Sequence, residues 1–532
     1  MASTLIQSGA ALQIVDTSGV VTTLTLPTGI VLATDRPPRF ARFGNYVVLV
    51  NTPNRPISID PLGKVRVLVP YAPSTKVTVA SGGAGALTGV YKVKQTFVIR
   101  DGHGNIIAES DFGPAMNPGF TAAANTLAVS AINISADKIT GSNLYRTTAG
   151  GETYFKWREL DGNTQTTAPN NDLSDLSLEV FAAPTLGTPP DLSLVAEWRG
   201  RLWGASKVDL DILRWTEPGT MYAWSALNAM SIPRIGEDTR GVSGLLTRRE
   251  SLMVGRRNNL QQVTGTSNND FRLVKISDQV GIESNESIVV YKDIVFFLWK
   301  DGVYTLEGNE VTCISDTPRG LKKGGVRSWF ATDTYFNRAY FPNAKAIFDP
   351  VRLRYKLFLA AAGTSALNRW VEYDLQTGTW WGPHKTGAFT PASVLVAFDA
   401  DDAAFSLIGG TSGFLWKDQA TATDDTATAI DFDVDTVFNV SEAPAVDKFH
   451  GKLYVSGKVQ STGTIAVTPT IGRSNASAGS AFQYVMAKGK QLLGRLGNGL
   501  MYKLNFRHNV AAEPVELYGY EVDDIHPLGK RG

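Results

Sequence analysis

The sequence predicts an all-β protein, and three observations carry this prediction. Short apolar strands alternate with Gly or Asp-Gly turns between 198 and 416, as in DIVFFLWKDGVYTLEGNEV (293–311). Ten of the eleven tryptophans lie in this stretch and recur near strand ends, which is typical of radial or stacked β-hairpin repeats. Helical periodicity is weak, and its best candidates, near 320–331 and 486–496, are short. We therefore predict a β-propeller of about six blades.

The N-terminal segment, residues 1–75, contains strands that we expect to join the propeller. The piece ARFGNYVVLVNTPNRPISIDPLGKVRVL (41–68) has the same order of apolar strand, polar turn and apolar strand as the later repeats. Its Asn-Thr-Pro-Asn-Arg-Pro run (51–56) is typical loop chemistry.

The composition of residues 76–190 differs from that of the repeats and predicts an inserted domain. Tryptophan nearly vanishes, while small and polar residues become frequent. The piece YKVKQTFVIRDGHGNIIAES (91–110) predicts a hairpin with Asp101 at the start of its tip. Six or seven short strands in roughly a hundred residues favour an immunoglobulin- or fibronectin-like β-sandwich. The Pro-rich stretch 183–192 then leads back to the repeats.

The rest of the chain continues the repeats. Residues 191–425 are predicted to hold the main propeller blades, and residues 426–532 a C-terminal β unit that completes the ring. Four tryptophans at strand ends are expected to pack between adjacent blades. They are Trp203, Trp299, Trp380 and Trp416.

Composition limits the classes of function. Fifty-one basic and fifty acidic residues nearly balance, which argues against a dedicated nucleic-acid binder and makes self-association easier. The single cysteine, Cys313, excludes a disulfide within the chain and is interpreted as a small buried hydrophobe. The N-terminus has no secretory signal pattern and no apolar run reaches eighteen residues, so we expect synthesis in a reducing cytoplasm without membrane insertion.

Residues that could bind a metal or cofactor are scattered. The five histidines have no partner at metal-ligand spacing, so no metal site and no cofactor are predicted. Asp431, Asp433 and Asp435 alternate along one strand face, where they form either a solvated face or part of a cation site. The GRLGNG run (494–499) lacks the strand, helix and Lys-Ser/Thr ending of a phosphate loop.

A glycan-cleaving enzyme is the main alternative. Glycoside hydrolysis needs two carboxylates about 5–10 Å apart, and the sequence does not single out such a pair. The Ser-x-Asp-x-Gly-x-x-Trp repeat of sialidases is absent, and its nearest counterpart, SKVDLDILRW (206–215), lacks the glycine. We therefore predict a protein without enzymatic activity and keep a propeller that binds or hydrolyses glycans as the alternative.

The order of several pieces resembles a known family, the tail nozzle or tail tubular protein B-like proteins of short-tailed bacteriophages, which include packaged-DNA stabilisation proteins. The pieces that carry this resemblance are YKVKQTFVIRDGHGNIIAES (91–110), LYRTTAGGETYFKW (144–157), WRGRLWGASKVDLDILRWTEPGTMYAWS (198–225), LMVGRRNNLQQVTG (252–265), VGIESNESIVVYKDIVFFLWKDGVYTLEG (280–308), YDLQTGTWW (373–381) and LYGYEVDDIHPLGKRG (517–532).

The resemblance implies a structural role in the virion tail. It implies a β-propeller with an inserted sandwich, a C-terminal unit at the nozzle tip, and a homo-oligomer, expected to be a hexamer. This ring or tube would lie below the portal and adaptor, contact tail fibre or spike proteins, retain packaged DNA and form the ejection channel. The resemblance supplies no catalytic residue and no cofactor, and a host-glycan-binding or glycan-hydrolysing tail propeller is the alternative to this structural role.

The densest positive stretch of the chain is RGLKKGGVR (319–327). For a tube through which DNA passes, a weak contact between these residues and phosphate groups is attractive. We predict that they lie on a channel or intersubunit surface, and a solvated loop paired with acidic neighbours remains the alternative. The residues concerned are Arg319, Lys322, Lys323 and Arg327.

Overall fold

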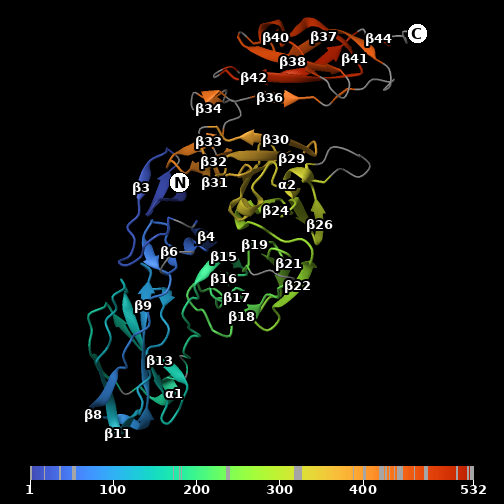
Figure 1. Ribbon diagram of the computed structural model, residues 1–532. Coiled ribbons are helices and arrows are strands. Elements are labelled where there is room, and N and C mark those ends of the chain that lie inside the picture. Colours follow the sequence, from blue (N-terminus) through green and yellow to red (C-terminus); the bar gives the residue numbers. More distant parts are fainter. Residues whose placement is uncertain are drawn as a thin grey trace. The chain divides into compact units, whose positions relative to one another are not determined.

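The computed structural model shows a succession of antiparallel strands along the chain (Figure 1). It describes residues 3–16, 18–34, 37–50, 55–171, 173–178, 180, 182–234, 240–316, 326–387, 389–398, 403–418, 424–425, 428–429, 432–436, 438–439, 447–460, 462–472, 477–510, 513, 515–523 and 526–527.

The prediction of an all-β protein is confirmed. The longest helical segment among the described residues, the 3₁₀ helix η2 (Arg338–Asn343), has six residues. Strands recur along the described chain, from β1 (Ser3–Ser8) to β44 (His526–Pro527). Within that described part, no helix has the length and apolar character needed to cross a membrane.

Among the described residues between 39 and 313, four segments each form a four-stranded antiparallel sheet in which strands adjacent in sequence pair; we call these sheets meanders (Figure 1). Meander 1 is β4 (Arg39–Phe43), β5 (Tyr46–Val50), β6 (Ile57–Ile59) and β7 (Val65–Val67). Meander 2 is β15 (Leu192–Trp198), β16 (Arg201–Ser206), β17 (Ile212–Trp215) and β18 (Ala229–Ser231). Meander 3 is β19 (Gly244–Thr247), β20 (Leu252–Gly255), β21 (Leu260–Thr264) and β22 (Arg272–Ser277). Meander 4 is β23 (Val289–Tyr291), β24 (Ile294–Trp299), β25 (Gly302–Glu307) and β26 (Glu310–Cys313).

Further strands continue this succession. The strands β27 (Lys345–Asp349) and β28 (Arg354–Leu359) pair antiparallel. They are followed by β29 (Arg369–Asp374), β30 (Thr379–Lys385), β31 (Pro391–Phe398), β32 (Ala404–Gly410) and β33 (Leu415–Asp418). At the N-terminus, β1, β2 (Ala11–Asp16) and β3 (Val21–Thr23) form a three-stranded sheet of their own.

Local sequence explains the meanders. The strand β24 is apolar at all six positions, and its last five residues are buried, which fits a strand covered on both faces. Between β15 and β16 the chain reverses through Arg199 (φ 52) and Gly200 (φ 66). Two consecutive residues with positive φ are typical of the tight hairpin turn that matches the twist of the strands, and Gly200 adopts this conformation without a steric penalty.

Tryptophans fill the space between consecutive meanders. Trp203 of meander 2 lies 5.0 Å, between ring centroids, from Phe271, the residue before β22 of meander 3. Trp299 of meander 4 donates its indole N–H to the carbonyl of Arg257 in meander 3, at 2.8 Å. Both tryptophans are buried, so the prediction that they pack between repeats is confirmed.

The other two predicted tryptophans are half-buried. Trp380 donates its indole N–H to the carbonyl of Ile314, directly after meander 4, at 2.9 Å. Trp416 contacts Phe389 and Phe414, with 5.3 and 6.0 Å between ring centroids. Trp380 therefore joins β30 to another repeat, as predicted. The ring contacts of Trp416 lie close to its own strand, so its packing between repeats stays a prediction.

Between meanders 1 and 2 the chain forms two sheets, which we call the inserted unit (residues 78–171). One sheet has the order β14 (Ala168–Asn171), β11 (Phe120–Ser130), β8 (Thr78–Tyr91). The other has the order β10 (Ile106–Glu109), β9 (Val93–Arg100), β12 (Gly141–Thr147), β13 (Tyr154–Asp161). Leu87 and Leu127 of the first sheet share a core with Leu144 and Trp157 of the second, so the two sheets pack against each other.

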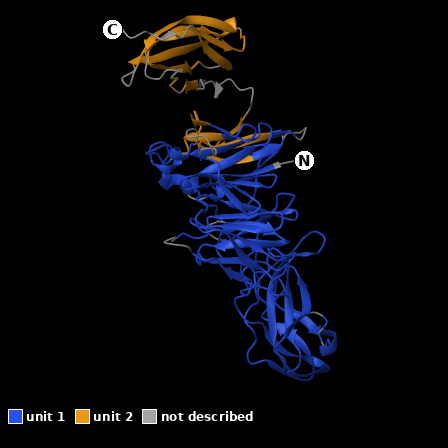
Figure 2. Ribbon diagram, turned by 90° about the vertical axis from the view of Figure 1, so that its right-hand side faces the viewer, with its two compact units in different colours: residues 1–365, 373–380, 396–404 blue, residues 366–372, 381–395, 405–532 orange. Residues whose placement is uncertain are grey.

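The chain divides into two compact units, coloured separately in Figure 2. Unit 1 is Met1–Ser365, Tyr373–Trp380 and Val396–Ala404, and unit 2 is Ala366–Glu372, Trp381–Leu395 and Phe405–Gly532. Unit 1 contains meanders 1–4 and the inserted unit.

Unit 2 ends in a C-terminal pair of sheets with a core of its own. One sheet has the order β36 (Phe432–Asp435), β42 (Met501–His508), β38 (Thr464–Gly472), β39 (Ser477–Ala478), and β40 (Phe482–Val485) also pairs with β38. The other has the order β41 (Lys490–Gly499), β37 (Lys448–Gly457), β43 (Leu517–Val522), and β44 also pairs with β37. Before them, β34 (Asp424–Asp425) pairs with β35 (Thr428–Ala429). Leu453 and Leu504, both fully buried, lie in this core.

Candidate functional site at the connecting end of the meanders

Antiparallel pairing brings two kinds of loop to the same end of each meander. The turn between the second and third strands lies at the end where the fourth strand finishes and the chain leaves for the next sheet. We call this the connecting end, and the opposite one the first-turn end. Ion pairs at the connecting end join the second turn of meanders 2, 3 and 4 to the segments that connect the sheets.

The basic stretch predicted from the sequence belongs to the connection that follows meander 4. Arg319, Lys322 and Lys323 lie outside the described residues. Arg327, the first residue of α2 (Arg327–Ala331), is described and forms ion pairs with Asp301 and Asp316. Its distance to Asp316 is 2.9 Å from Nη1 to Oδ2.

Arg327 is therefore tied to carboxylates of its own chain. Its hydrogen bond to Asp301 raises the pKa of the guanidinium above its ordinary value. The Arg327 side chain is 41% exposed. Whether Arg327 lies on a channel or intersubunit surface stays a prediction. The alternative, a solvated loop paired with acidic neighbours, agrees with the two ion pairs of Arg327.

A second ion cluster surrounds Asp211, in the second turn of meander 2. Arg234, in the connection to meander 3, donates from Nε to Asp211 at 2.7 Å, and Arg256, in the second turn of meander 3, donates from Nη1 at 2.7 Å. The hydrogen bond from Arg234, helped by Arg256, lowers the pKa of Asp211. Arg256 is fully buried and also donates to the carbonyls of Ile232 and Arg240. It therefore fixes the loops around it as well as the carboxylate.

A third cluster is built on Glu283, in the connection between meanders 3 and 4. Arg240 and Arg257 both approach its carboxylate at 3.1 Å, one at each oxygen. The Glu283 side chain is only 3% exposed, whereas those of Arg240 and Arg257 are 42% and 44% exposed. The buried carboxylate thus orients two guanidinium groups that reach the surface.

The fourth cluster joins residues from distant repeats. Glu286, in the same connection, forms ion pairs with Arg39, the first residue of β4, and with Lys345, the first residue of β27. Burial raises the pKa of Glu286, but the charges of Lys345 and Arg39 outweigh it, so that its pKa lies below the ordinary value. This carboxylate therefore holds meander 1 to a strand that follows meander 4.

The inserted unit is attached at the same end. Arg55, in the second turn of meander 1, makes a bidentate ion pair with Asp137 at 2.6 and 3.0 Å. The backbone N–H of Tyr71 donates to the same carboxylate at 3.1 Å. Burial raises the pKa of Asp137, but the bonds from Arg55 and Tyr71 outweigh it and lower the pKa overall. The inserted unit is thus clamped to meander 1 rather than attached by its two chain crossings alone.

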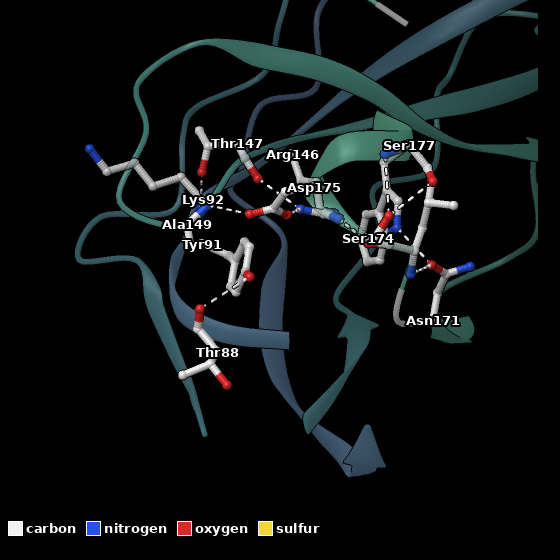
Figure 3. A network of polar contacts seen from close by, with 12 residues as sticks. Thr88, Tyr91, Lys92, Arg146, Thr147, Ala149, Asn171, Ser174, Asp175 and Ser177 are labelled. Atoms are coloured by element: carbon white, nitrogen blue, oxygen red, sulfur yellow. Dashed lines mark hydrogen bonds and ion pairs between the residues drawn. The ribbon is translucent and has the colours of Figure 1, made fainter. Parts of the chain in front are cut away.

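A buried arginine of the inserted unit holds α1 (Asp175–Leu178), which follows the unit in the chain, in place (Figure 3). Arg146 is fully buried and donates from Nη1 to Asp175 at 2.7 Å. The other oxygen of Asp175 accepts from the backbone N–H of Ala149 at 2.8 Å. The Arg146 guanidinium also lies 5.1 Å from the ring centroid of Tyr91 and 5.8 Å from that of Trp157. All of these partners belong to the fold, so we interpret this network as structural.

The remaining sequence candidates have ordinary partners. Asp433 accepts from Asn505 and Asp435 pairs with Lys503 at 3.0 Å, both across the pairing of β36 with β42, while Asp431 lies outside the described residues. The GRLGNG run is part of strand β41. In the part of the chain that the structure describes, no group of three or more His, Cys, Asp or Glu side chains could hold a metal ion.

The carboxylates that organise this site were missed by the sequence analysis. Asp211, Glu283 and Glu286 stand among ordinary loop residues, and their cationic partners are 23 to 247 residues away in sequence. The topology of the sheets could have predicted these ion pairs. A meander places its second turn beside the connection to the next sheet, so charged residues in the turn and in the connection become neighbours.

Comparisons with known proteins give little more. No protein-family profile matches the chain, and no curated protein is similar to it. Among solved structures, the chain is similar to a novel fungal alcohol oxidase of the AA5 family in complex with copper, with 10% sequence identity and a TM-score of 0.24 over 98% of this chain and 91% of that chain. A likeness this weak assigns no fold, reaction or copper site to this chain.

One expectation must nevertheless be corrected. The sequence predicted a protein without enzymatic activity, and the matched structure is an enzyme, which contradicts that prediction. The prediction relied on the β-repeat pattern, which indicates only the fold. One fold can carry either a structural surface or an active site. We therefore withdraw the prediction.

Proposed function

We propose that this chain is a structural component of a short-tailed bacteriophage tail: a nozzle protein that assembles as a homo-oligomer, a hexamer by its resemblance, into a ring or tube. In this proposal the assembly lies below the portal and adaptor, contacts tail fibre or spike proteins, retains packaged DNA and forms the ejection channel. The observation that carries it is the order of sheets: a meander, an inserted pair of sheets, and then further consecutive meanders, in the order that the resemblance implies.

A β-propeller is the finer fold that we propose, and the Glu286 cluster supports it. Arg39 belongs to meander 1, whereas Glu286 connects meanders 3 and 4. Packed sheets lie about 10 Å apart, so in a linear stack two intervening sheets would keep these residues beyond the reach of one ion pair. Sheets arranged around a common axis bring the starts of their first strands together.

For the inserted unit we propose an immunoglobulin- or fibronectin-like β-sandwich. Seven strands divided into sheets of four and three, packed on one shared core, support this assignment. Its clamp to meander 1 suits a part that must keep a fixed direction in a larger assembly.

The experiment that tests the function is imaging and mass measurement of the assembly. The purified chain at high concentration should form rings or tubes of several copies in electron micrographs, with a matching mass in solution. An antibody against a tag on the chain should label the tail of intact virions. A protein that stays monomeric at high concentration and is absent from virions would overturn the proposal.

A further inference from the structure

Two histidines lie buried in the C-terminal pair of sheets. His450 belongs to β37, which pairs with β41 on one side and with β43 and β44 on the other (Figure 1). His508 is the last residue of β42, in the other sheet. A buried imidazole takes up a proton readily only where the positive charge is compensated, so the surroundings of each ring decide how it responds to pH.

His450 is held in one uncharged form. Its side chain is fully buried, and its Nε2 lies 3.1 Å from the carbonyl oxygen of Gly499, so Nε2 carries the hydrogen and donates it. Nδ1 is also buried and has no hydrogen-bond partner among the described residues. The ring packs edge-on against Tyr502 of β42, with 5.0 Å between ring centroids, so it lies between the two sheets. A proton added to Nδ1 would be buried without an acceptor.

The charged and titratable groups around His450 do not favour its protonation. Lys448, on the same strand, is buried and adds a second positive charge. Tyr502, from β42, stays uncharged because burial raises the pKa of its hydroxyl. β41 presents the backbone of Gly499, and β44 brings His526 beside the strand by backbone pairing. None of the carboxylates that the structure describes raises the pKa of His450.

These surroundings fix the direction of the pH dependence. Burial is the largest cause that lowers the pKa of His450 below its ordinary value of 6.5, the bond to Gly499 opposes this shift, and the charge of Lys448 adds to it. The unfolded chain therefore takes up a proton at a higher pH than the folded sheets do. Their stability is complete above pH 6.5 and falls as the pH decreases toward the folded-state pKa.

His508 has the compensation that His450 lacks. Its Nδ1 donates to the carbonyl of Thr464 at 2.7 Å, and its Nε2 lies 3.5 Å from Oε2 of Glu513. A proton on Nε2 of His508 therefore meets a carboxylate rather than a second cation. Because His508 is also buried in the same pair of sheets, it provides a matched control for His450.

We propose that His450 is a pH switch whose protonation at mildly acidic pH opens the C-terminal pair of sheets, while the meanders of unit 1 stay closed. β37 pairs with strands on both sides, so moving His450 away from Gly499 and Tyr502 disturbs both its own sheet and the packing between the two sheets. Unit 1 contains a single histidine, His103, which is exposed in the turn between β9 and β10. The switch does not depend on the function proposed above.

The test is amide hydrogen exchange of the full-length chain, measured by mass spectrometry between about pH 7.5 and pH 5.5, above the range in which most carboxyl groups titrate. After correction for the intrinsic exchange rate, the opening constant of β37 and β42 should rise below pH 6.5 by up to about tenfold per pH unit, the limit for one proton. The opening constant of β24 in meander 4 should stay within about twofold.

Two variants assign the effect to one ring. His450→Gln keeps an N–H donor for the Gly499 carbonyl but takes up no proton, so the rise in the opening constant should shrink to less than about twofold. The control His508→Asn keeps a donor for the Thr464 carbonyl and should retain the rise of the wild type. His450→Phe keeps a ring against Tyr502 and should open more easily at every pH, without the dependence on pH.

A wild-type chain in which β37 opens no more at pH 5.5 than at pH 7.5 would overturn the proposal, and this result needs no variant. A rise that persists in His450→Gln or in His450→Phe, or that disappears in His508→Asn, would also overturn it, because another group would then carry the effect. An equal rise in β24 would show a general loss of stability in acid instead of a switch in the C-terminal pair of sheets.

Discussion

Glu286 is the residue on which the most distant parts of unit 1 converge. The change Glu286→Gln removes the charge that holds Arg39 and Lys345 and leaves two cations with reduced compensation. We expect the free energy of unfolding at neutral pH to fall by about 2–4 kcal/mol, because breaking a largely buried ion pair costs more than the pair contributes. Denaturant unfolding measures the change. The control Glu310→Gln, on the exposed face of β26, should stay within about 0.5 kcal/mol of the wild type.

The same residue predicts a pH dependence. The folded-state pKa of Glu286 lies below the ordinary value of 4.5, so its ion pairs stabilise the fold above that pH. This contribution disappears as the pH falls through the folded-state pKa. Unfolding measured between neutral and acidic pH should therefore show a steeper loss of stability in the wild type than in Glu286→Gln. Two parallel profiles would contradict the assignment.

Trp299 tests the packing between repeats. Replacing it with Ala should lower the free energy of unfolding by about 3–5 kcal/mol, because a large buried side chain is lost. Trp299→Phe keeps most of the apolar area but leaves the Arg257 carbonyl without its donor, at a cost of about 1–3 kcal/mol. Chemical denaturation of both variants gives these values. Trp381→Phe is the control, since that side chain is 52% exposed, and a cost as large as that of Trp299→Phe would show that burial between meanders is not the cause.

At the scale of elements, the ion pair between Arg55 and Asp137 should control how firmly the inserted unit is held. Asp137→Asn keeps the shape of the side chain and removes its charge. We expect faster amide hydrogen exchange around Tyr71, whose N–H donates to this carboxylate, while the C-terminal sheets stay unchanged. Exchange measured by mass spectrometry gives the comparison. Asp161→Asn, an exposed residue of β13, should leave the pattern as it is in the wild type.

The elements also show how far sequence reasoning reaches. Alternation and turn chemistry predicted the hairpin of β9 and β10, where the Asp101 side chain accepts from the backbone N–H groups of His103 and Asn105. The weak helical periodicity near 486–496 does not correspond to an α-helix, because the segment is a 3₁₀ turn followed by β41. In its pairing with β37, the register shifts between Leu453 and Tyr454 and leaves Leu493 of β41 as an extra residue, so the alternation expected of a regular strand is interrupted there.

The candidate site was less accessible to sequence reasoning. The density of positive charge singled out Arg327, but nothing local indicated its partner Asp301, 26 residues earlier. Arg256 and Asp211 are likewise 45 residues apart. Ion pairs of this kind follow from how sheets meet, and a single sequence carries no direct signal for them.

At the scale of the whole molecule, two separate cores predict two unfolding events. The core of the C-terminal sheets contains Leu504, and the core between meanders 3 and 4 includes the buried strand β24, with Phe297. Leu504→Ala should cost about 2–5 kcal/mol and shift only one calorimetric transition. Phe297→Ala, with a cost of about 3–5 kcal/mol, should shift only the other. A single transition moved equally by both variants would show one cooperative unit instead.

The ion pair between Arg39 and Glu286 also has a consequence for biosynthesis. Its two residues are 247 positions apart, and at about 5–20 residues per second a ribosome needs roughly 12–50 seconds to make the chain between them. Throughout that interval the first strand of meander 1 has emerged without its distant carboxylate. Apolar surface that stays exposed until a later segment is synthesised is prone to aggregate. We therefore expect the nascent chain to depend on chaperones until the segment around Glu286 has been made. The clamp between Arg55 and Asp137, only 82 residues apart, can form much earlier and hold meander 1 to the inserted unit during this delay.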